Sequence, residues 1–314
     1  MLLQAVCKLS AFSFLDGIPS SGYFAPMNKT SLIAQINAKK SFLCVGLDTD
    51  LKKIPAHLLS YTNPVLAFNK AMIDATRDLC VAYKINTAFY EANGAAGWQT
   101  MEETFAYIGG EHLKIADAKR GDIGNTSDQY ARAFFEQVKA DAITVAPYMG
   151  EDSIRPFLAY PDKWTIVLGL TSNTGSNDFE RLKLDAEQYD TRFVPNVVQG
   201  NRSELLYEKV LKTVSGWGTP ENLMFVIGAT HAQELEHIRS IIPEHFILVP
   251  GLGAQGGSLE EVASHGLNKE TGLLLNASRA IIYASSKEDF AEAARIQAQT
   301  YATEMVGYLS KEMG

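Results

Sequence analysis

The stretch LKIADAKRGDI, residues 113–123, places an apolar, strand-like run directly before a cluster of charged residues. A helical pattern, TSDQYARAFFEQV at 126–138, follows it. Nearly continuous apolar runs are typical of parallel strands that are buried on both faces. The stretch therefore predicts one strand–helix unit with polar side chains at the carboxyl end of its strand.

The same unit recurs along the chain from Ser41 onward. Apolar runs lie at 41–48, 81–90, 113–119, 142–147, 165–172, 224–230, 246–253 and 272–282. Helical patterns separate them, for example at 64–78, 203–217 and 288–309. Eight strand–helix pairs predict an α/β fold of the (β/α)8 type, a closed TIM barrel of eight parallel strands.

An open doubly wound sheet is the rival fold, and the placement of polar residues separates the two. A barrel carries its chemistry at the carboxyl ends of many different strands, and this chain has polar residues at such ends throughout. They are Asp48, Lys84, Asp117, Lys119, Ser172, Gln255 and Arg279. We expect residues 27–314 to form a single barrel domain, with a polar insertion between Asn173 and Leu223, and residues 1–26 to be a flexible extension.

Composition narrows the classes of protein that the chain can belong to. Of its 314 residues 46% are hydrophobic and 20% charged, which is typical of a globular protein and excludes disorder. The net charge of −8 speaks against a general nucleic-acid partner. The sequence contains no run of 18 apolar residues, so no membrane span is predicted. The three cysteines form no C-x-x-C pair, so we expect a reducing cytoplasm.

Four charged residues are expected to meet at one end of the barrel. Asp117 and Lys119 are two apart on one strand and should face the same way, Asp122 follows in the loop, and Lys84 lies on the neighbouring strand. A salt-bridged network that only balances buried charge is one interpretation. The other is chemical: carboxylates would repel a bound carboxylate, loss of CO2 would relieve the repulsion, and Lys119 would supply a proton without any cofactor.

Two segments after the last strands are suited to bind phosphate. PGLGAQGG, residues 250–257, follows the seventh run, and NASR, residues 276–279, closes the eighth. Barrel enzymes frequently bind phosphate with these loops, where glycines expose backbone N–H groups and an arginine can hold two oxygens. The match of residues 251–256 to the dinucleotide pattern G-x-G-x-x-G is weak, because no nucleotide-binding half follows it. A glycine-rich turn without a ligand is the remaining alternative.

Taken together, these motifs resemble the orotidine 5′-phosphate decarboxylase family, and within it the larger bacterial subgroup. The resemblance runs from about Phe42 to Ala284 and is specific because the motifs occur jointly and in order. They are FLCVGLDTD, YKIN, DAKRGDIGNT, VAPYMG, LTSNTGS, VIGATH, PGLGAQGG and NASRAI. The resemblance implies conversion of orotidine 5′-monophosphate to UMP and CO2, with no cofactor and no metal.

The resemblance also implies roles for individual residues. Lys119 matches the proton donor, Asp117 and Asp122 its flanking carboxylates, and Lys84 the fourth member of the tetrad. Family members share their sites across a homodimer, so Asp122 and Thr126 would reach into the partner's pocket.

The remaining matches are substrate-binding residues. Asp48 matches a ribose-binding residue, Ser172 a residue that reads the pyrimidine, Gln255 a residue of the loop over the phosphate, and Arg279 the phosphate-binding arginine. The phosphate loop is expected to include Gly253, Gly256, Gly257 and Ser278. Ser278 stands where other branches often have glycine, which puts one backbone contact to phosphate in doubt.

Two alternatives remain open. A Mg2+-dependent sugar-phosphate decarboxylase or aldolase of the same barrel superfamily resembles the chain at D-x-K-x-x-D and at the phosphate loops. Those relatives use a glutamate on the second strand as a metal ligand, whereas this chain has Lys84, whose ammonium would repel a cation. A phosphate-binding barrel without catalysis is the other alternative, and the intact set of four charges argues against it.

Overall fold

The computed structural model describes residues 26–184, 204–252 and 257–312. In these residues eight parallel strands close into one barrel with the order β1-β10-β9-β8-β5-β4-β3-β2. The strands are β1 (Leu43–Gly46), β2 (Ala82–Asn86), β3 (Leu113–Arg120), β4 (Ala142–Val145), β5 (Trp164–Leu170), β8 (Leu223–Ile227), β9 (Phe246–Pro250) and β10 (Leu273–Ala277). Closure comes from β1, which pairs with β2 on one side and with β10 on the other. The predicted TIM barrel is confirmed.

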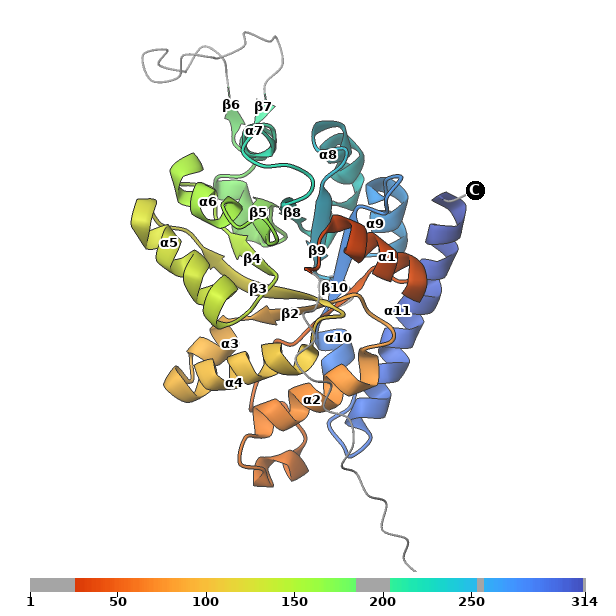
Figure 1. The fold of residues 1–314 in the computed structure, drawn as a ribbon. Helices are drawn as coiled ribbons and strands as arrows, with labels where there is room; N and C mark the ends of the chain where they lie inside the picture. Colours follow the sequence, from red (N-terminus) through yellow and green to blue (C-terminus); the bar gives the residue numbers. More distant parts are fainter. Residues whose placement is uncertain (1–25, 185–203, 253–256, 313–314) are drawn as a thin grey trace, which may run out of the picture.

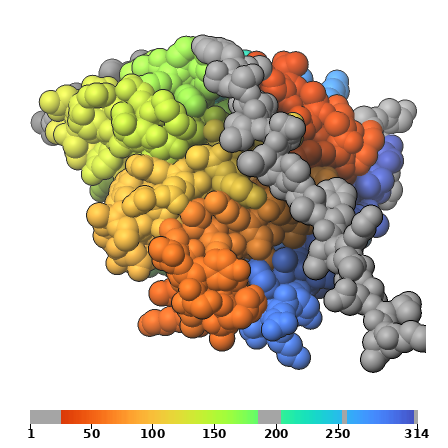
Figure 2. Space-filling view, turned by 60° about the horizontal axis from the view of Figure 1, so that its bottom comes forward, coloured from red at the N-terminus to blue at the C-terminus, as the bar shows by residue number. Residues whose placement is uncertain are grey.

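Helices surround the strands, as Figure 1 shows. The main ones are α1 (Lys29–Lys39), α2 (Pro64–Thr76), α4 (Gly94–Ile108), α5 (Gly124–Arg132), α6 (Glu151–Leu158), α7 (Leu206–Ser215), α8 (Leu235–Ile241), α9 (Leu259–Gly266) and α11 (Phe290–Glu312). The last of them packs against α2, so that the blue C-terminal part of the chain adjoins the orange part in Figure 2. Among the described helices, none has both the length and the apolar composition that a membrane span needs.

Side-chain caps fix where several helices begin. Asn28 Oδ1 accepts the N–H of Ser31 at 2.9 Å at the start of α1, and Asn63 Oδ1 accepts that of Leu66 at 3.1 Å at the start of α2. Pro64 occupies the first position of α2, where its missing N–H costs nothing. These caps satisfy donors that the helix itself leaves free.

Two predicted strands are too long. The runs at 81–90 and 272–282 end as strands at Asn86 and Ala277 and continue as the short helices α3 (Ala88–Glu91) and α10 (Arg279–Ile282). Tyr90 of α3 and Ile281 and Ile282 of α10 still enter the core, whereas Phe89 of α3 is exposed. A short apolar run has the same composition in a buried strand and in a buried helical turn, so composition could not locate the change.

The described part of the polar insertion contains a 3-10 turn, two short strands and a helix. A 3-10 turn, Thr174–Asp178, is followed by a two-stranded antiparallel hairpin of β6 (Lys183–Leu184) and β7 (Glu204–Leu205). This hairpin leads directly into α7 (Figure 1). The expectation for the extension at 1–26 falls, apart from Pro26, outside the described residues.

A buried arginine ties the amino-terminal end of the barrel together. Arg239 of α8 is 9% exposed, and its guanidinium donates to the carbonyls of Gly266, His245 and Gly272 at 2.6 Å each. These carbonyls lie at the end of α9 and just before β9 and β10. Burial lowers the pKa of Arg239 to about 10. The guanidinium therefore joins two helices and two strands through backbone acceptors.

We expect Arg239→Met to lower the free energy of unfolding by about 2–4 kcal/mol, because several buried carbonyls lose their donor while the volume of the side-chain stem is kept. Urea unfolding followed by circular dichroism measures this change. Arg155→Met, which removes an exposed ion pair with Glu151 on α6, is the control and should cost less than about 1 kcal/mol. Equal losses of unfolding free energy in the two variants would contradict the role assigned to Arg239.

Candidate active site

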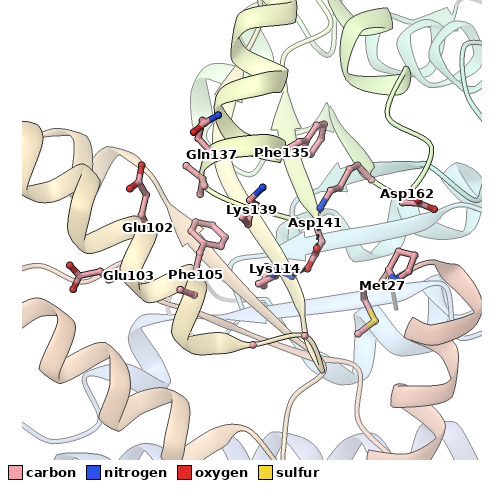
Figure 3. A pocket seen from close by; sticks show the side chains of 16 residues that line it. Met27, Glu102, Glu103, Phe105, Lys114, Phe135, Gln137, Lys139, Asp141 and Asp162 are labelled. Atoms are coloured by element: carbon pink, nitrogen blue, oxygen red, sulfur yellow. Dashed lines mark hydrogen bonds and ion pairs between the residues drawn. The ribbon is translucent and has the colours of Figure 1, made fainter. Parts of the chain in front are cut away.

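Among the hollows in the described residues, two lie at opposite ends of the barrel. The larger, about 870 Å³, lies at the amino-terminal rim, where Lys114 and Asp141 approach each other near Phe105 (Figure 3). Asp141 is already shared there by Lys114 at 3.8 Å and by Lys163 at 3.3 Å. The smaller, about 520 Å³, lies at the carboxyl ends of the strands, where barrel enzymes carry their chemistry. The arrangement of charges, and not size, identifies the second hollow as the candidate site.

Most of the residues predicted from the sequence line this carboxyl-end hollow. They come from the ends of five strands or from the loops after them. The predicted residues in its wall are Asp48, Lys84, Asp117, Lys119, Ser172, Ser278 and Arg279. The fold therefore brings together side chains that are up to 231 residues apart in the sequence, counted from Asp48 to Arg279 (279 − 48).

Four of these side chains form a continuous array of alternating charge. Lys119 Nζ lies 2.5 Å from Asp117 Oδ1, and Lys84 Nζ lies 2.9 Å from Asp117 Oδ2. Lys84 Nζ is also 3.5 Å from Asp48 Oδ1. The order within one chain is thus Lys119–Asp117–Lys84–Asp48. Three of the four expected members, Lys84, Asp117 and Lys119, meet in this array, whereas its fourth member within the chain is Asp48 and not the expected Asp122.

Burial and pairing act in opposite directions on the ionisation of the array. Burial by itself would lower the pKa of Lys84, but attraction to Asp117 and Asp48 outweighs burial and raises the pKa above its ordinary value. Burial would raise the pKa of Asp117, but the two lysines outweigh it and hold the pKa well below the usual range. Lys84 and Asp117 are therefore charged at neutral pH.

An irregular strand presents Asp117 and Lys119 to the hollow. On β3, Ala116 pairs with Ile143 of β4 and Arg120 with Val145, so three residues of β3 lie opposite Thr144 alone. This is a β-bulge, and within it Lys119 has a left-handed backbone with φ of 47°. We expected the two side chains to share a face because strand residues alternate. Both do line the hollow, but a bulge and not a regular strand places them there.

Polar contacts hold the bulge from both sides. On the inner side, the backbone N–H of Lys119 donates to Thr144 Oγ1 at 2.9 Å, and the Thr144 hydroxyl donates to Asp117 Oδ1 at 3.1 Å. On the outer side, Arg120 Nη1 donates to the carbonyl of Ala118 at 2.8 Å and also pairs with Glu91. The bulge thus keeps its backbone groups bonded although the regular ladder is interrupted.

Close packing at two glycines shapes the rest of the wall. A Cβ at Gly46 would lie 1.8 Å from Ser278 Oγ, and one at Gly228 would lie 2.7 Å from the Cβ of Ser172. Both strand ends therefore need glycine so that the side chains of Ser278 and Ser172 can occupy their places. Asp48 is fixed through its backbone, since its carbonyl accepts the Tyr283 hydroxyl at 3.1 Å.

Comparison with known proteins identifies the family. Residues 41–295 match the family described as orotidine 5′-phosphate decarboxylase / HUMPS. The chain belongs to this family. An orotidine 5′-phosphate decarboxylase of Parabacteroides distasonis is 54% identical over 286 residues, which cover 90% of this chain and 96% of that protein. The resemblance drawn from the sequence motifs is confirmed.

Solved structures of the family have the same fold. The OMP decarboxylase of Leishmania donovani superposes with a TM-score of 0.71 at 34% identity, covering 90% of this chain and 99% of that one. The UMP synthase of the same organism gives a TM-score of 0.70 at 37% identity and covers 86% of this chain. The chain spans only 56% of that longer protein.

Several residues expected from the family resemblance lie away from the hollow or outside the described residues. Asp122 and Thr126 follow β3 but do not line the hollow of their own chain, and Thr126 is exposed. Gly257 packs against Ala229 and does not line it either. The expectations for Gly253, Gln255 and Gly256 fall outside the described residues.

Thr144 and Glu180 are among the polar residues at the site that sequence reasoning missed. Thr144 was visible as the one hydroxyl in the apolar run AITVAP, although nothing in the run indicates which strand residue it bonds. Glu180 lies in the insertion and lines the hollow, where its carboxylate accepts the N–H and the hydroxyl of Thr171 at 2.7 and 2.8 Å. The position of Glu180 in the sequence did not indicate that it reaches the hollow, because the insertion has no strand or helix periodicity.

The electrostatic role of Asp117 predicts a pH dependence of stability. Its folded pKa lies below the unfolded value of about 3.9, so its ionised form stabilises the fold above that pH, and this contribution is lost as the pH falls further. The unfolding free energy of the wild type relative to Asp117→Asn should therefore decline as the pH is lowered from 6 to about 3. Urea unfolding at several pH values measures the difference. A difference that is constant or grows on acidification would contradict the assignment.

Proposed function

We propose that the chain decarboxylates orotidine 5′-monophosphate to UMP and CO2, the last step of de novo UMP synthesis. The array Lys119–Asp117–Lys84–Asp48 at the mouth of the barrel carries this proposal, because it sets a proton donor beside a fixed carboxylate in a hollow of nucleotide size. The relatives that carry the name orotidine 5′-phosphate decarboxylase support the same reaction.

The reaction is carried by charged side chains, three of which, Lys119, Asp117 and Lys84, lie together within this chain. The substrate carboxylate on C6 is placed near Asp117, the C6–carboxylate bond breaks, CO2 leaves, and the electron pair remains on C6. The ammonium of Lys119 stabilises that negative charge and then donates a proton to C6. Asp117 holds the Lys119 ammonium in position until then, at a contact of 2.5 Å. Lys84 balances the charge of Asp117 and stays bound to it.

The remaining wall residues take the rest of the nucleotide. Arg279 at the end of β10 is assigned to the phosphate, together with Ser278 and the loop containing Gly253, Gln255, Gly256 and Gly257. Asp48 is assigned to the ribose hydroxyls and Ser172 to the pyrimidine. The phosphate is remote from the bond that breaks, so its binding energy is available to close the site around the substrate.

The sugar-phosphate alternative requires a divalent cation, and the site is unsuited to one. The second-strand position that holds a carboxylate in those enzymes is Lys84, whose ammonium lies 2.9 Å from Asp117. Among the described residues, no group of three or more His, Cys, Asp or Glu side chains could hold a metal ion. We therefore assign the chain no metal and no cofactor.

The proposal includes a cytoplasmic homodimer with shared sites. Asp122 and Thr126 lie outside the hollow of their own chain, where they are free to complete the site of a partner. Large apolar side chains are exposed on the loops after β3, β4 and β5, with Ile123 60%, Tyr148 91% and Phe179 64% exposed. Such exposure is typical of surfaces that a partner covers. Cys44 and Cys80 are free and buried, which suits a reducing compartment.

The direct test follows the absorbance of orotidine 5′-monophosphate mixed with the protein in excess EDTA. We expect loss of the substrate band, with UMP as the product and a rate unaffected by the chelator. Lys119→Ala should lose turnover by several orders of magnitude while UMP still binds in calorimetry, since its phosphate contacts remain. Activity that appears only with Mg2+, or a fully active Lys119→Ala variant, would refute the proposed mechanism.

Mixing two inactive variants tests the shared site. Lys119→Ala and Asp122→Ala chains should each be inactive alone, because one lacks the proton donor and the other a flanking carboxylate. In a mixed dimer, one of the two sites has both residues, so random exchange of subunits should restore about a quarter of the wild-type activity. No recovery after verified exchange would mean that each chain builds its own complete site.

A further inference from the structure

We propose that Thr144 is a positioning residue for the decarboxylation: its hydroxyl holds the β3 bulge so that the Lys119 ammonium rests against Asp117 beside the substrate. The inference rests on the proposed function and extends it to a residue of β4 that would not itself touch the substrate. Thr144 is 1% exposed and lies opposite the centre of the bulge.

The hydroxyl of Thr144 is used fully and in a fixed direction. A hydroxyl has one proton to donate, and Thr144 donates it to Asp117 Oδ1 at 3.1 Å. Its oxygen accepts the backbone N–H of Lys119 at 2.9 Å. One side chain thus binds both the carboxylate of the array and the backbone from which the proton donor projects. Asp117 Oδ1 receives Thr144 and Lys119 together.

The backbone of Lys119 needs such support. A residue other than glycine in the left-handed region costs about 1–2 kcal/mol, and Lys119 is there with φ of 47°. In a regular parallel ladder β4 carbonyls would accept the N–H groups of β3, but across the bulge the Lys119 N–H bonds the Thr144 side chain instead. Without that hydroxyl, the strained conformation would lose a bond that stabilises it.

Packing does not hold the side chain of Lys119. Half of it is exposed, at 49%, whereas the side chain of Lys84 in the same array is only 4% exposed. The position of the Lys119 ammonium is therefore set by its bond to Asp117 and by the direction in which its backbone projects. Both depend on Thr144, and an error of about 1 Å in placing a catalytic group can reduce a rate a hundredfold.

The composition of β4 agrees with a specific role for the hydroxyl. The neighbours of Thr144 are Ile143 and Val145, both fully buried, and valine has nearly the same shape as threonine. A buried hydroxyl without a bond costs free energy, so valine would be the favourable residue here if packing alone decided. The two bonds of Thr144 explain why threonine occupies the position.

The test compares kcat and KM for orotidine 5′-monophosphate in matched variants. Thr144→Val keeps the shape and removes the hydroxyl, and we expect kcat to fall ten- to a hundredfold while KM stays within about threefold. Thr144→Ser restores the hydroxyl and should recover kcat to within about threefold of the wild type. Thr144→Ala, which cannot clash, should show the same loss as valine and replaces it if the valine variant fails to fold.

Thr165→Val is the matched control. Thr165 is a fully buried threonine on the neighbouring strand β5, and among the described residues its hydroxyl has no hydrogen-bond partner. Its replacement removes the same atom from a buried strand position without touching the array, so kcat should be unchanged.

The outcomes separate this inference from the proposed function. A wild type that does not convert orotidine 5′-monophosphate refutes the function. An active wild type refutes the Thr144 inference if Thr144→Val has normal kcat, if its defect is in KM alone, if Thr144→Ser fails to recover, or if Thr165→Val loses as much activity. A loss of kcat confined to the variants without the hydroxyl establishes the positioning role.

Discussion

The site depends on one carboxylate that neutralises two ammonium groups. Asp117 is buried at the end of β3 and binds Lys119 through one oxygen and Lys84 through the other. Removing a partner from such a group leaves an uncompensated buried charge, which is far more costly than the net gain of the intact pair. The array therefore has one arrangement in which all its charges are satisfied, and the strand ends around it are built to keep that arrangement.

The two lysines differ in exposure, and this difference divides their tasks. Lys84 projects from a regular strand and is enclosed, which fixes it as a counter-charge. Lys119 projects from a bulge and is half exposed to the hollow, where a ligand can approach it. A regular β3 would also place Asp117 and Lys119 on one face, since they are two residues apart; the bulge changes the backbone from which Lys119 projects, which has a φ of 47°. Catalytic geometry is thus obtained from a local departure from regular structure that neighbouring residues stabilise.

The sequence predicted the barrel and most of the site because both leave local signals. Apolar runs of strand length repeat eight times, and the charged residues directly follow them, so Asp48, Lys84, Asp117 and Lys119 could be placed at one end of the barrel. The bulge could not be predicted, since it is a property of the pairing between β3 and β4 and not of either strand alone. For the same reason the bond between Thr144 and Asp117 could not be predicted, although both residues are present in the sequence. Glu180 was missed because it comes from an insertion without periodicity. The lengths of β2 and β10 were predicted wrongly because helical turns of the same apolar composition follow these strands.

The order of the array has a consequence for how binding and chemistry are connected. Within one chain it ends on Asp48, the residue assigned to the ribose, and not on Asp122. Contacts of 3.5, 2.9 and 2.5 Å then run without a gap from the sugar-binding carboxylate through Lys84 and Asp117 to the proton donor. In the proposed reaction, hydrogen bonds from the ribose to Asp48 act on a group that already balances part of the charge of Lys84. Any shift of the Lys84 ammonium changes the electrostatic interaction of Asp117, because the two groups bind each other directly in a site of low exposure. The sugar is thereby linked electrostatically to the lysine that protonates the base, and binding the correct nucleotide favours the arrangement in which Lys119 is in place.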